Sequence, residues 1–119
     1  MNTDAKQLSL ALTAPFPADA ILWKPLSVKG NRALAAAYLD ARAVMQRLDS
    51  VFAVGGWKDA YQVVNGGSVV CTLSVKVDGE WVEKTDVGSP SEQPDDGDKL
   101  KAAFSDALKH AAIKLGIGT

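Results

Sequence analysis

Few residues of this sequence are of the types that catalyse reactions, and their spacing does not bring them together. The chain contains one histidine, His110, and one cysteine, Cys71. A nucleophile needs a base within hydrogen-bond reach, but Ser105 lies five positions before His110 on another face of a predicted helix, and Cys71 points into the predicted core. The sequence has no glycine-rich phosphate loop and no helical pair of metal ligands with a third in reach. We therefore expect no catalytic residue, no metal site and no cofactor.

A second group of residues has the chemistry to bind phosphates. Cations lie on a long predicted helix, which carries Arg42 and Arg47, and on the last predicted helix, which carries Lys101, Lys109, His110 and Lys114. Together such side chains can contact several phosphates of a nucleic acid. A single solvated lysine is ordinary, so the prediction depends on one condition: cations from the two helices must converge along one trough.

Large aromatic residues occur near these cations. Trp57, Tyr61 and Trp81 lie in a predicted three-stranded meander, and such rings stack on unpaired bases. We expect Trp57 and Tyr61 to belong to the core. Trp81 is predicted to lie cross-strand from Lys76 on the polar face, where it is exposed. The residue types alone make single-stranded nucleic acid a plausible ligand.

Charge is distributed unevenly along the chain. The 119 residues carry a formal net charge of −1 and have a sequence pI of about 5.7, which taken whole argues against a nucleic-acid partner. However, residues 78–98 contain eight acidic residues and one lysine, a net −7, whereas residues 1–77 and residues 99–119 each carry +3. The chain is therefore a modestly basic body with one acidic segment, and residues 92–98 of it are expected to be a solvated loop.

Length and composition limit the other classes of protein. A chain of 119 residues with 47% hydrophobic residues forms one compact domain. A lone cysteine makes no internal disulfide, and no apolar run reaches the roughly 20 residues that cross a bilayer. The N-terminus does not resemble a secretion signal. We expect a cytoplasmic protein with no membrane contact.

The elements that would position these residues follow from hydrophobic periodicity. Residues 5–13 predict a short helix that ends before two prolines, and residues 21–28 predict an extended segment. Asn31 is a suitable N-cap for a long helix that ends near residue 52, before Gly55 and Gly56. Its apolar stripe is Leu34, Ala37, Tyr38, Ala41, Met45, Leu48 and Phe52.

After this helix the hydrophobic period changes to two. Residues 57–64, 68–77 and 80–88 predict three strands separated by hairpin signals, Asn-Gly-Gly at 65–67 and Asp-Gly at 78–79. If residues 65–67 form a three-residue loop, Tyr61 and Val63 pair with Cys71 and Val69 and join the buried face. Asp98 is expected to cap the last helix, whose apolar stripe is Leu100, Phe104, Ala107, Leu108, Ala111 and Leu115. The predicted fold is α+β: a three-stranded antiparallel meander packed against a long helix and a C-terminal helix.

Two other interpretations of this pattern remain open. The order helix, three strands, helix is also that of double-stranded-RNA-binding domains, whose last helix begins with phosphate-binding lysines, and Lys99 and Lys101 occupy that place here. The acidic stretch directly before them argues against this class. A non-catalytic scaffold domain would instead use Arg42 and Lys109 in ordinary surface ion pairs.

Several short motifs occur in one order along the chain. They are Tyr38-Leu39-Asp40-Ala41-Arg42, Gly56-Trp57, the strand that bears Cys71, Trp81 with Asp86-Val87-Gly88, and Asp106-Ala107-Leu108-Lys109-His110-Ala111 with Leu115-Gly116. In this order they resemble the annealing domain of the Rad52 family, and they are most similar to its bacterial branch, the DNA damage response A (DdrA) proteins. The resemblance covers about residues 15–118.

The resemblance implies a protein that binds single-stranded DNA by its backbone, protects DNA ends and anneals complementary strands during repair. Lys109 matches the phosphate-contacting lysine of the family, and Arg42 matches its arginine in the same groove. His110 stands where the family usually has arginine and would be mostly neutral at pH 7; Lys114 would partly replace that charge. Family members form rings, and a lone meander leaves two edge strands to cover, so we expect a homo-oligomer. We also expect residues 1–119 to be one annealing domain, truncated at its C-terminus and acting at the nucleoid.

Overall fold

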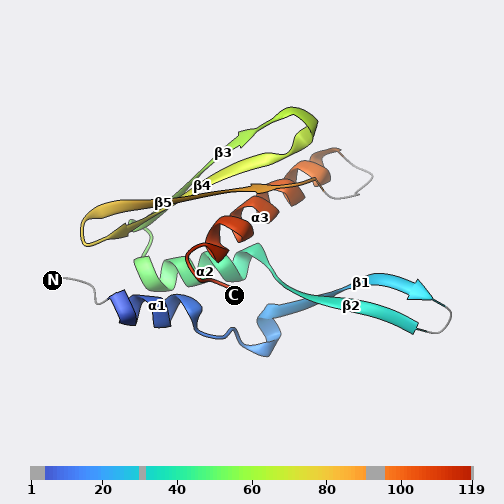
Figure 1. Cartoon of the computed structure of the whole chain (residues 1–119), viewed down its shortest axis with the longest axis horizontal. Coiled ribbons are helices and arrows are strands. Elements are labelled where there is room, and N and C mark those ends of the chain that lie inside the picture. The colour runs from blue at the N-terminus through green and yellow to red at the C-terminus, as the bar shows by residue number, and fades with distance from the viewer. Residues whose placement is uncertain (1–4, 30–31, 91–95, 119) are drawn as a thin grey trace.

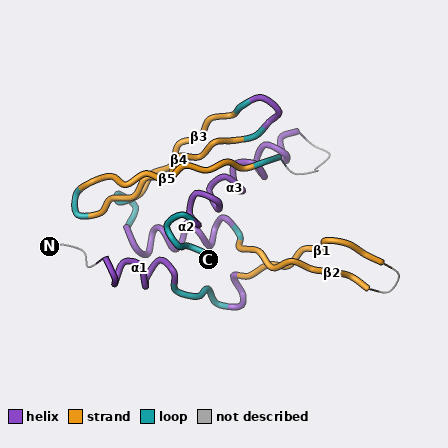
Figure 2. Tube along the Cα trace, viewed as in Figure 1, coloured by secondary structure: helices purple, strands orange, loops and turns teal. Residues whose placement is uncertain are grey.

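A computed structural model of the chain describes residues 5–29, 32–90 and 96–118. Figure 1 and Figure 2 show the order of its elements. These are α1 (Ala5–Thr13), a 3-10 turn η1 (Ala18–Ala20), β1 (Ile21–Lys29), β2 (Arg32–Leu39), α2 (Ala41–Phe52), β3 (Trp57–Val63), a 3-10 turn η2 (Asn65–Gly67), β4 (Val69–Val77), β5 (Glu80–Gly88) and α3 (Asp96–Ile113). The expected α+β class is confirmed, and a two-stranded hairpin is added to it.

The core lies between the meander and α3. One face of β4 is buried through Val69, Cys71, Leu73 and Val75, as its alternating sequence predicts. Small residues of α3 pack against this face, and Leu48 of α2 completes the cluster. The lone cysteine is therefore a packing residue.

The register of the meander also matches the expectation. Tyr61 pairs with Cys71 and Val63 with Val69, across a loop in which Gly66 and Gly67 have positive φ. Tyr61 packs partly buried against the core, whereas Val63 is 51% exposed, so its predicted burial is wrong. Val63 lies on β3, an edge strand, whereas α3 packs chiefly on β4 and β5, which explains the difference.

The predicted long helix is wrong in its first half. Residues 32–39 form β2, which pairs antiparallel with β1 from Ile21↔Leu39 to Lys29↔Arg32. Alanine-rich sequence favours a helix locally, but strand pairing with β1 satisfies the backbone here. The helix begins after Asp40, whose carboxylate accepts a hydrogen bond from the Arg42 backbone N–H at 3.1 Å. The proposed cap Asn31 lies outside the described residues.

The hairpin β1–β2 extends away from the rest of the molecule, as Figure 1 shows. Its two strands contact chiefly each other. The sequence of the hairpin is nevertheless strongly apolar. Near the base of the hairpin, Trp23 is 68% exposed. An isolated two-stranded hairpin is at best marginally stable in water, and this hairpin receives little packing from the rest of the described chain.

The last helix differs from the expectation at its start. It begins at Asp96, so Asp98 lies within its first turn and is not the residue that precedes it. Acidic residues in that turn favour the positive end of the helix dipole. Leu100 is 40% exposed, contrary to the expected stripe, because it precedes the part of α3 that crosses the sheet. The polar connection at residues 91–95 lies outside the described part of the chain.

The segment after α1 is attached to α2 by Arg47. Its guanidinium donates to the carbonyl oxygens of Leu12 and Ala14 at 3.0 and 2.8 Å, and it lies 4.0 Å from the centre of the Phe16 ring. The sequence predicts Arg47 among the phosphate-binding cations. Its role in the structure is instead to satisfy the carbonyl groups at the C-terminal end of α1.

Candidate nucleic-acid interface

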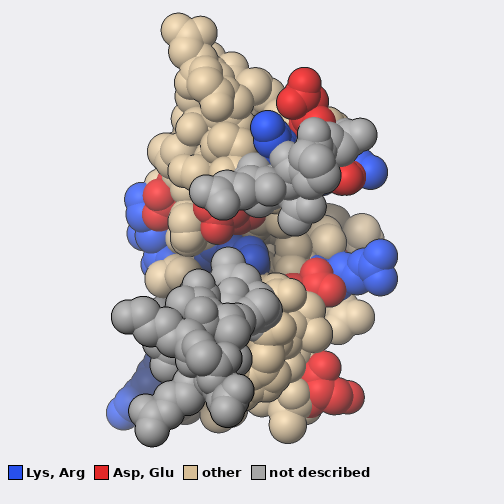
Figure 3. All heavy atoms as spheres, turned by 90° about the vertical axis from the view of Figure 1, so that its right-hand side faces the viewer, with Lys and Arg blue, Asp and Glu red and all other residues tan. Residues whose placement is uncertain are grey.

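A groove runs between the base of the hairpin, the start of α2 and the outer side of α3. It consists of two adjoining hollows of about 610 and 360 Å³ that share Tyr38, Asp106 and Lys109. The larger hollow is also lined by Leu22, Asp40, Ala41, Ser89, Pro90, Ala102 and Ser105, and the smaller by Leu39, Val44, His110, Ile113, Ile117 and Gly118. We call this continuous surface the groove. Figure 3, which faces the hairpin side, shows blue and red side chains close together between the two ends of the molecule.

Lys109 lies where the two hollows meet. Its side chain is half-buried, and the ammonium nitrogen is 5.4 Å from the centre of the Tyr38 ring on the hairpin. The aromatic face attracts the ammonium group, which holds it over the groove floor. The structure therefore places Lys109, the lysine that matches the family's phosphate-contacting residue, inside a groove between separate elements.

Arg42 lies beside the groove on the first turn of α2. Its two preceding residues, Asp40 and Ala41, line the larger hollow, and its own side chain is exposed. No contact joins Arg42 to Lys109 within the described residues. The structure thus brings the start of α2 to the groove, while the convergence of the two cations on one strand of DNA is still a prediction.

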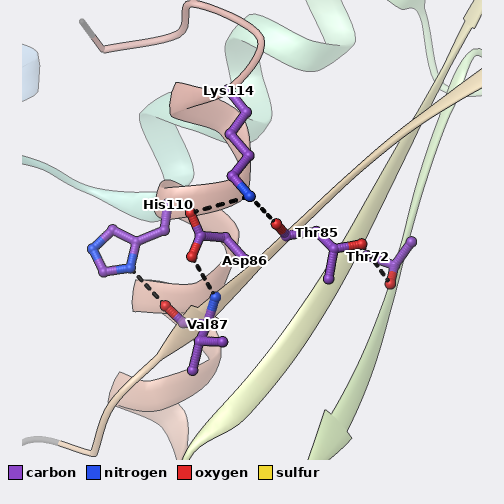
Figure 4. Close-up of polar contacts among 6 residues, drawn as sticks. All are labelled: Thr72, Thr85, Asp86, Val87, His110 and Lys114. Atoms are coloured by element: carbon purple, nitrogen blue, oxygen red, sulfur yellow. Dashed lines mark hydrogen bonds and ion pairs between the residues drawn. The ribbon is translucent and has the colours of Figure 1, made fainter.

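His110 has a polar contact at each ring nitrogen, and Figure 4 shows the hydrogen bond at Nδ1. Since a carbonyl oxygen only accepts, Nδ1 carries a proton and donates to the Val87 oxygen at 2.7 Å. Nε2 lies 3.4 Å from a carboxylate oxygen of Asp106. His110 therefore lines the smaller hollow while it also ties α3 to β5.

Lys114 points to β5. Its ammonium group donates to the Thr85 carbonyl oxygen and lies 3.8 Å from a carboxylate oxygen of Asp86 (Figure 4). That carboxylate also accepts a hydrogen bond from the backbone N–H of Val87. The charge of Lys114 is consequently shared with an acidic neighbour.

A sequence model of the Rad52/22 family of double-strand break repair proteins matches residues 4–119. The chain belongs to the Rad52/22 family. Two relatives named single-stranded DNA-binding protein DdrA are 41% identical over 109 residues in Deinococcus deserti and 40% identical over 109 residues in Deinococcus radiodurans. Each match covers 90% of this chain, and the chain spans about half the length of these relatives, 52% and 50%. The family and the bacterial branch that the motifs indicated are both confirmed.

Lys101 extends the cationic side of α3 in this Rad52/22 domain. It is exposed, and it lies two helical turns before Lys109, with Ser105 between them on the same side. Lys99, one of the two lysines that favoured a double-stranded-RNA module, lies 3.8 Å from Asp96 and is paired with it. The start of α3 is therefore acidic and partly neutralised.

Two groove residues of the Rad52/22 domain carry no signal in the sequence that marks them as site candidates. The sequence places Tyr38 in the apolar stripe of a predicted helix and Asp106 only in a short motif. Asp106 accepts a hydrogen bond from the Ser89 backbone N–H at 3.1 Å in addition to its contact with His110. It therefore fixes the end of β5 to α3. Only the pairing of β1 with β2 places Tyr38 opposite Lys109, and a single sequence does not show that pairing.

The thiol of Cys71 is unsuited to nucleophilic chemistry. It is fully buried, and burial raises its pKa to about 11, although a hydrogen bond with Tyr61 acts in the opposite direction. Since the thiolate is the nucleophile, this cysteine is inert near neutral pH.

Within the described residues, no three His, Cys, Asp or Glu side chains gather to hold a metal ion. None of the described helices is long and apolar enough to cross a membrane.

Proposed function

We propose that this domain binds single-stranded DNA through its sugar-phosphate backbone in the groove, protects DNA ends and promotes annealing of complementary strands in repair. One observation carries the proposal: Lys109 lies where two hollows meet between the hairpin, α2 and α3. Membership of the Rad52/22 family and the names of the two DdrA relatives support it. The site of action is then the nucleoid, in the cytoplasm.

No covalent bond is made or broken in this function. A strand held along the groove is extended, and its charge is partly neutralised, so that repulsion between two polyanions falls and hairpins that hide bases are removed. Contacts to the backbone carry no sequence information. We therefore expect affinity for single strands with little sequence preference.

The candidate residues are expected to contribute unequally to DNA binding. Lys109 and Arg42 are the principal phosphate contacts, and Lys101 extends the contact along α3. His110 contributes through its ring at the smaller hollow. Lys114 shares its charge with Asp86, so its contribution is the smallest of the set.

The test is a titration of single-stranded and duplex oligonucleotides of several sequences at a series of salt concentrations. Lys109→Ala and Arg42→Ala should each weaken single-strand binding by about fivefold, or about 1 kcal/mol, uniformly across sequences. The salt slope should become shallower by about 0.7 for each phosphate that the variant no longer neutralises. Lys99→Ala is the matched control on α3, since Lys99 is paired with Asp96.

Three outcomes contradict parts of the proposal. Unchanged affinity at every salt concentration in both variants removes Lys109 and Arg42 from the interface. A preference of the natural chain for duplex over single strands favours the double-stranded-RNA-type module. A chain that binds neither ligand is a scaffold domain.

We also propose that the domain forms a homo-oligomer, a ring of side-by-side protomers. The three-stranded sheet has β3 and β5 as its edges in the described part of the chain, and the hairpin exposes apolar residues. Exposed edges and apolar patches are characteristic of interfaces. Light scattering should give a mass several times that of one chain, and a strict monomer at high concentration would contradict a ring.

A further inference from the structure

One face of the three-stranded sheet is not covered by any described helix, and it carries an aromatic and basic cluster. Helix α3 packs against the other face through β4 and β5 (Figure 1). On the open face, Trp81 of β5 lies directly opposite Lys76 of β4, and Lys58 of β3 lies one strand further on. Trp81 is 40% exposed, and both lysines are exposed. We call these three residues the sheet cluster.

The sheet cluster is preformed across all three strands. The ammonium nitrogen of Lys58 lies 4.3 Å, and that of Lys76 5.6 Å, from the centre of the Trp81 ring. Because β4 lies between β3 and β5, the contact between Lys58 and Trp81 passes over β4. Ser74 occupies the position between them in the register and is only 3% exposed, although its side chain belongs to the open face. The indole and the Lys58 stem therefore lie across the sheet as one platform.

Within the part of the chain that the structure describes, no ion pair neutralises the positive charge of the sheet cluster. Among the described residues, Lys99 and Lys114 are paired with Asp96 and Asp86, whereas neither Lys58 nor Lys76 has a carboxylate within ion-pair distance. Glu83 is the nearest acidic residue in the register, and Ser74 lies between it and Lys58. An aromatic ring with two unpaired ammonium groups has the chemistry to bind an anionic ligand that also has a flat face.

We propose that the sheet cluster is a second contact surface for single-stranded DNA, on which a nucleobase stacks on the exposed part of Trp81 and Lys58 and Lys76 bind adjacent phosphates. The inference rests on the proposed function for the identity of the ligand. A duplex does not fit this surface because its base faces are covered by neighbouring base pairs. The groove lies along α3, so this second contact is on the opposite side of the sheet from the groove.

The experiment compares variants of the full chain in titrations with a thymidine oligonucleotide. Stacking of one base on an aromatic side chain contributes about 1–3 kcal/mol, so Trp81→Leu should weaken binding at least about fivefold. Trp81→Phe keeps a stacking face and should restore most of the affinity. The double variant Lys58→Ala/Lys76→Ala should reduce the salt slope by about 1.4, equivalent to two phosphates. Lys84→Ala is the control, since Lys84 lies on β5 with its side chain on the opposite face.

Tryptophan fluorescence gives a readout that a purely structural role of the cluster would not change. Adding the oligonucleotide should quench the emission of the natural chain, and Trp81→Phe should lose most of that quenching while it keeps its far-ultraviolet circular dichroism. If affinity, salt slope and quenching are unchanged in the sheet-cluster variants while Lys109→Ala weakens binding, this inference is overturned and the proposed function is retained. If the natural chain binds no single strand, both are overturned.

Discussion

Asp40 is expected to stabilise the fold and to weaken DNA binding. Its carboxylate caps α2 by accepting the Arg42 N–H, and it also adds negative charge to the larger hollow near Lys109. Asp40→Ala should lower the free energy of unfolding by about 1 kcal/mol through loss of the cap, and it should tighten single-strand binding. Asp40→Asn separates the effects, because asparagine keeps the cap and removes the charge. Thermal unfolding and a DNA titration of both variants measure this, and weaker DNA binding by Asp40→Asn would show that the carboxylate is not repelling phosphate.

The buried thiol of Cys71 predicts a dependence of stability on pH. Its pKa is raised to about 11 in the folded state, so the folded chain holds this proton more tightly than the unfolded chain does. The resulting stability is complete below the ordinary thiol pKa and is lost as the pH rises through 11. Between pH 8.5 and 10 the free energy of unfolding should fall by about 1 kcal/mol more in the natural chain than in Cys71→Ala.

Urea unfolding at three pH values in that range tests the prediction. Tyr61 has its own pKa raised by burial and by its hydrogen bond to Asp59, but its ordinary pKa of about 10 confines its effect to the upper end of this window, and the residue is present in both chains. Parallel curves for the natural chain and Cys71→Ala would show that the thiol does not titrate differently in the two states.

At the scale of elements, the contact between β5 and α3 depends on Gly88. A methyl group added there would lie 2.3 Å from both the Ala103 carbonyl oxygen and the Ala107 backbone nitrogen. Gly88→Ala must therefore move the helix away from the sheet, and we expect the free energy of unfolding to fall by about 1–3 kcal/mol. Gly55→Ala is the control, because nothing lies within 4 Å of its added methyl group. Equal stability of the two variants in urea unfolding would mean that α3 adjusts without cost.

The sequence allowed the meander to be predicted with its register, but not the hairpin β1–β2. Asn65-Gly66-Gly67 and Asp78-Gly79 are hairpin-turn sequences, and their glycines adopt the positive φ that such turns require. The run Ala35–Ala37 favours a helix by propensity, and its strand state depends on pairing with residues 23–25 of β1, although Gly-Asn at 30–31 is itself a hairpin signal in the sequence. The same pairing places Tyr38 over Lys109. For this reason the cations of the site were predictable one by one, whereas the walls of the groove were not.

At the scale of the whole molecule, lysines on different surfaces have different neighbours. Ion pairs neutralise Lys99 and Lys114 beside the acidic segment, while Lys109 in the groove faces an aromatic ring. The net charge of −1 therefore conceals local differences: Lys58 and Lys76 of the sheet cluster have no ion pair among the described residues, whereas Lys109 shares the groove with Asp40 and Asp106.

The hairpin gives the most direct prediction for assembly. Trp23 is largely exposed on an element that the rest of the described chain does not cover, and burying such a ring contributes about 2–3 kcal/mol. In the proposed oligomer a neighbouring protomer covers it. Trp23→Asp should therefore shift the mass measured by light scattering toward the monomer, with the fold unchanged because the side chain has few contacts within its own chain. Trp23→Phe should keep the oligomer. An unchanged oligomer in Trp23→Asp would place the interface elsewhere, with the edges of β3 and β5 as the next surfaces to test.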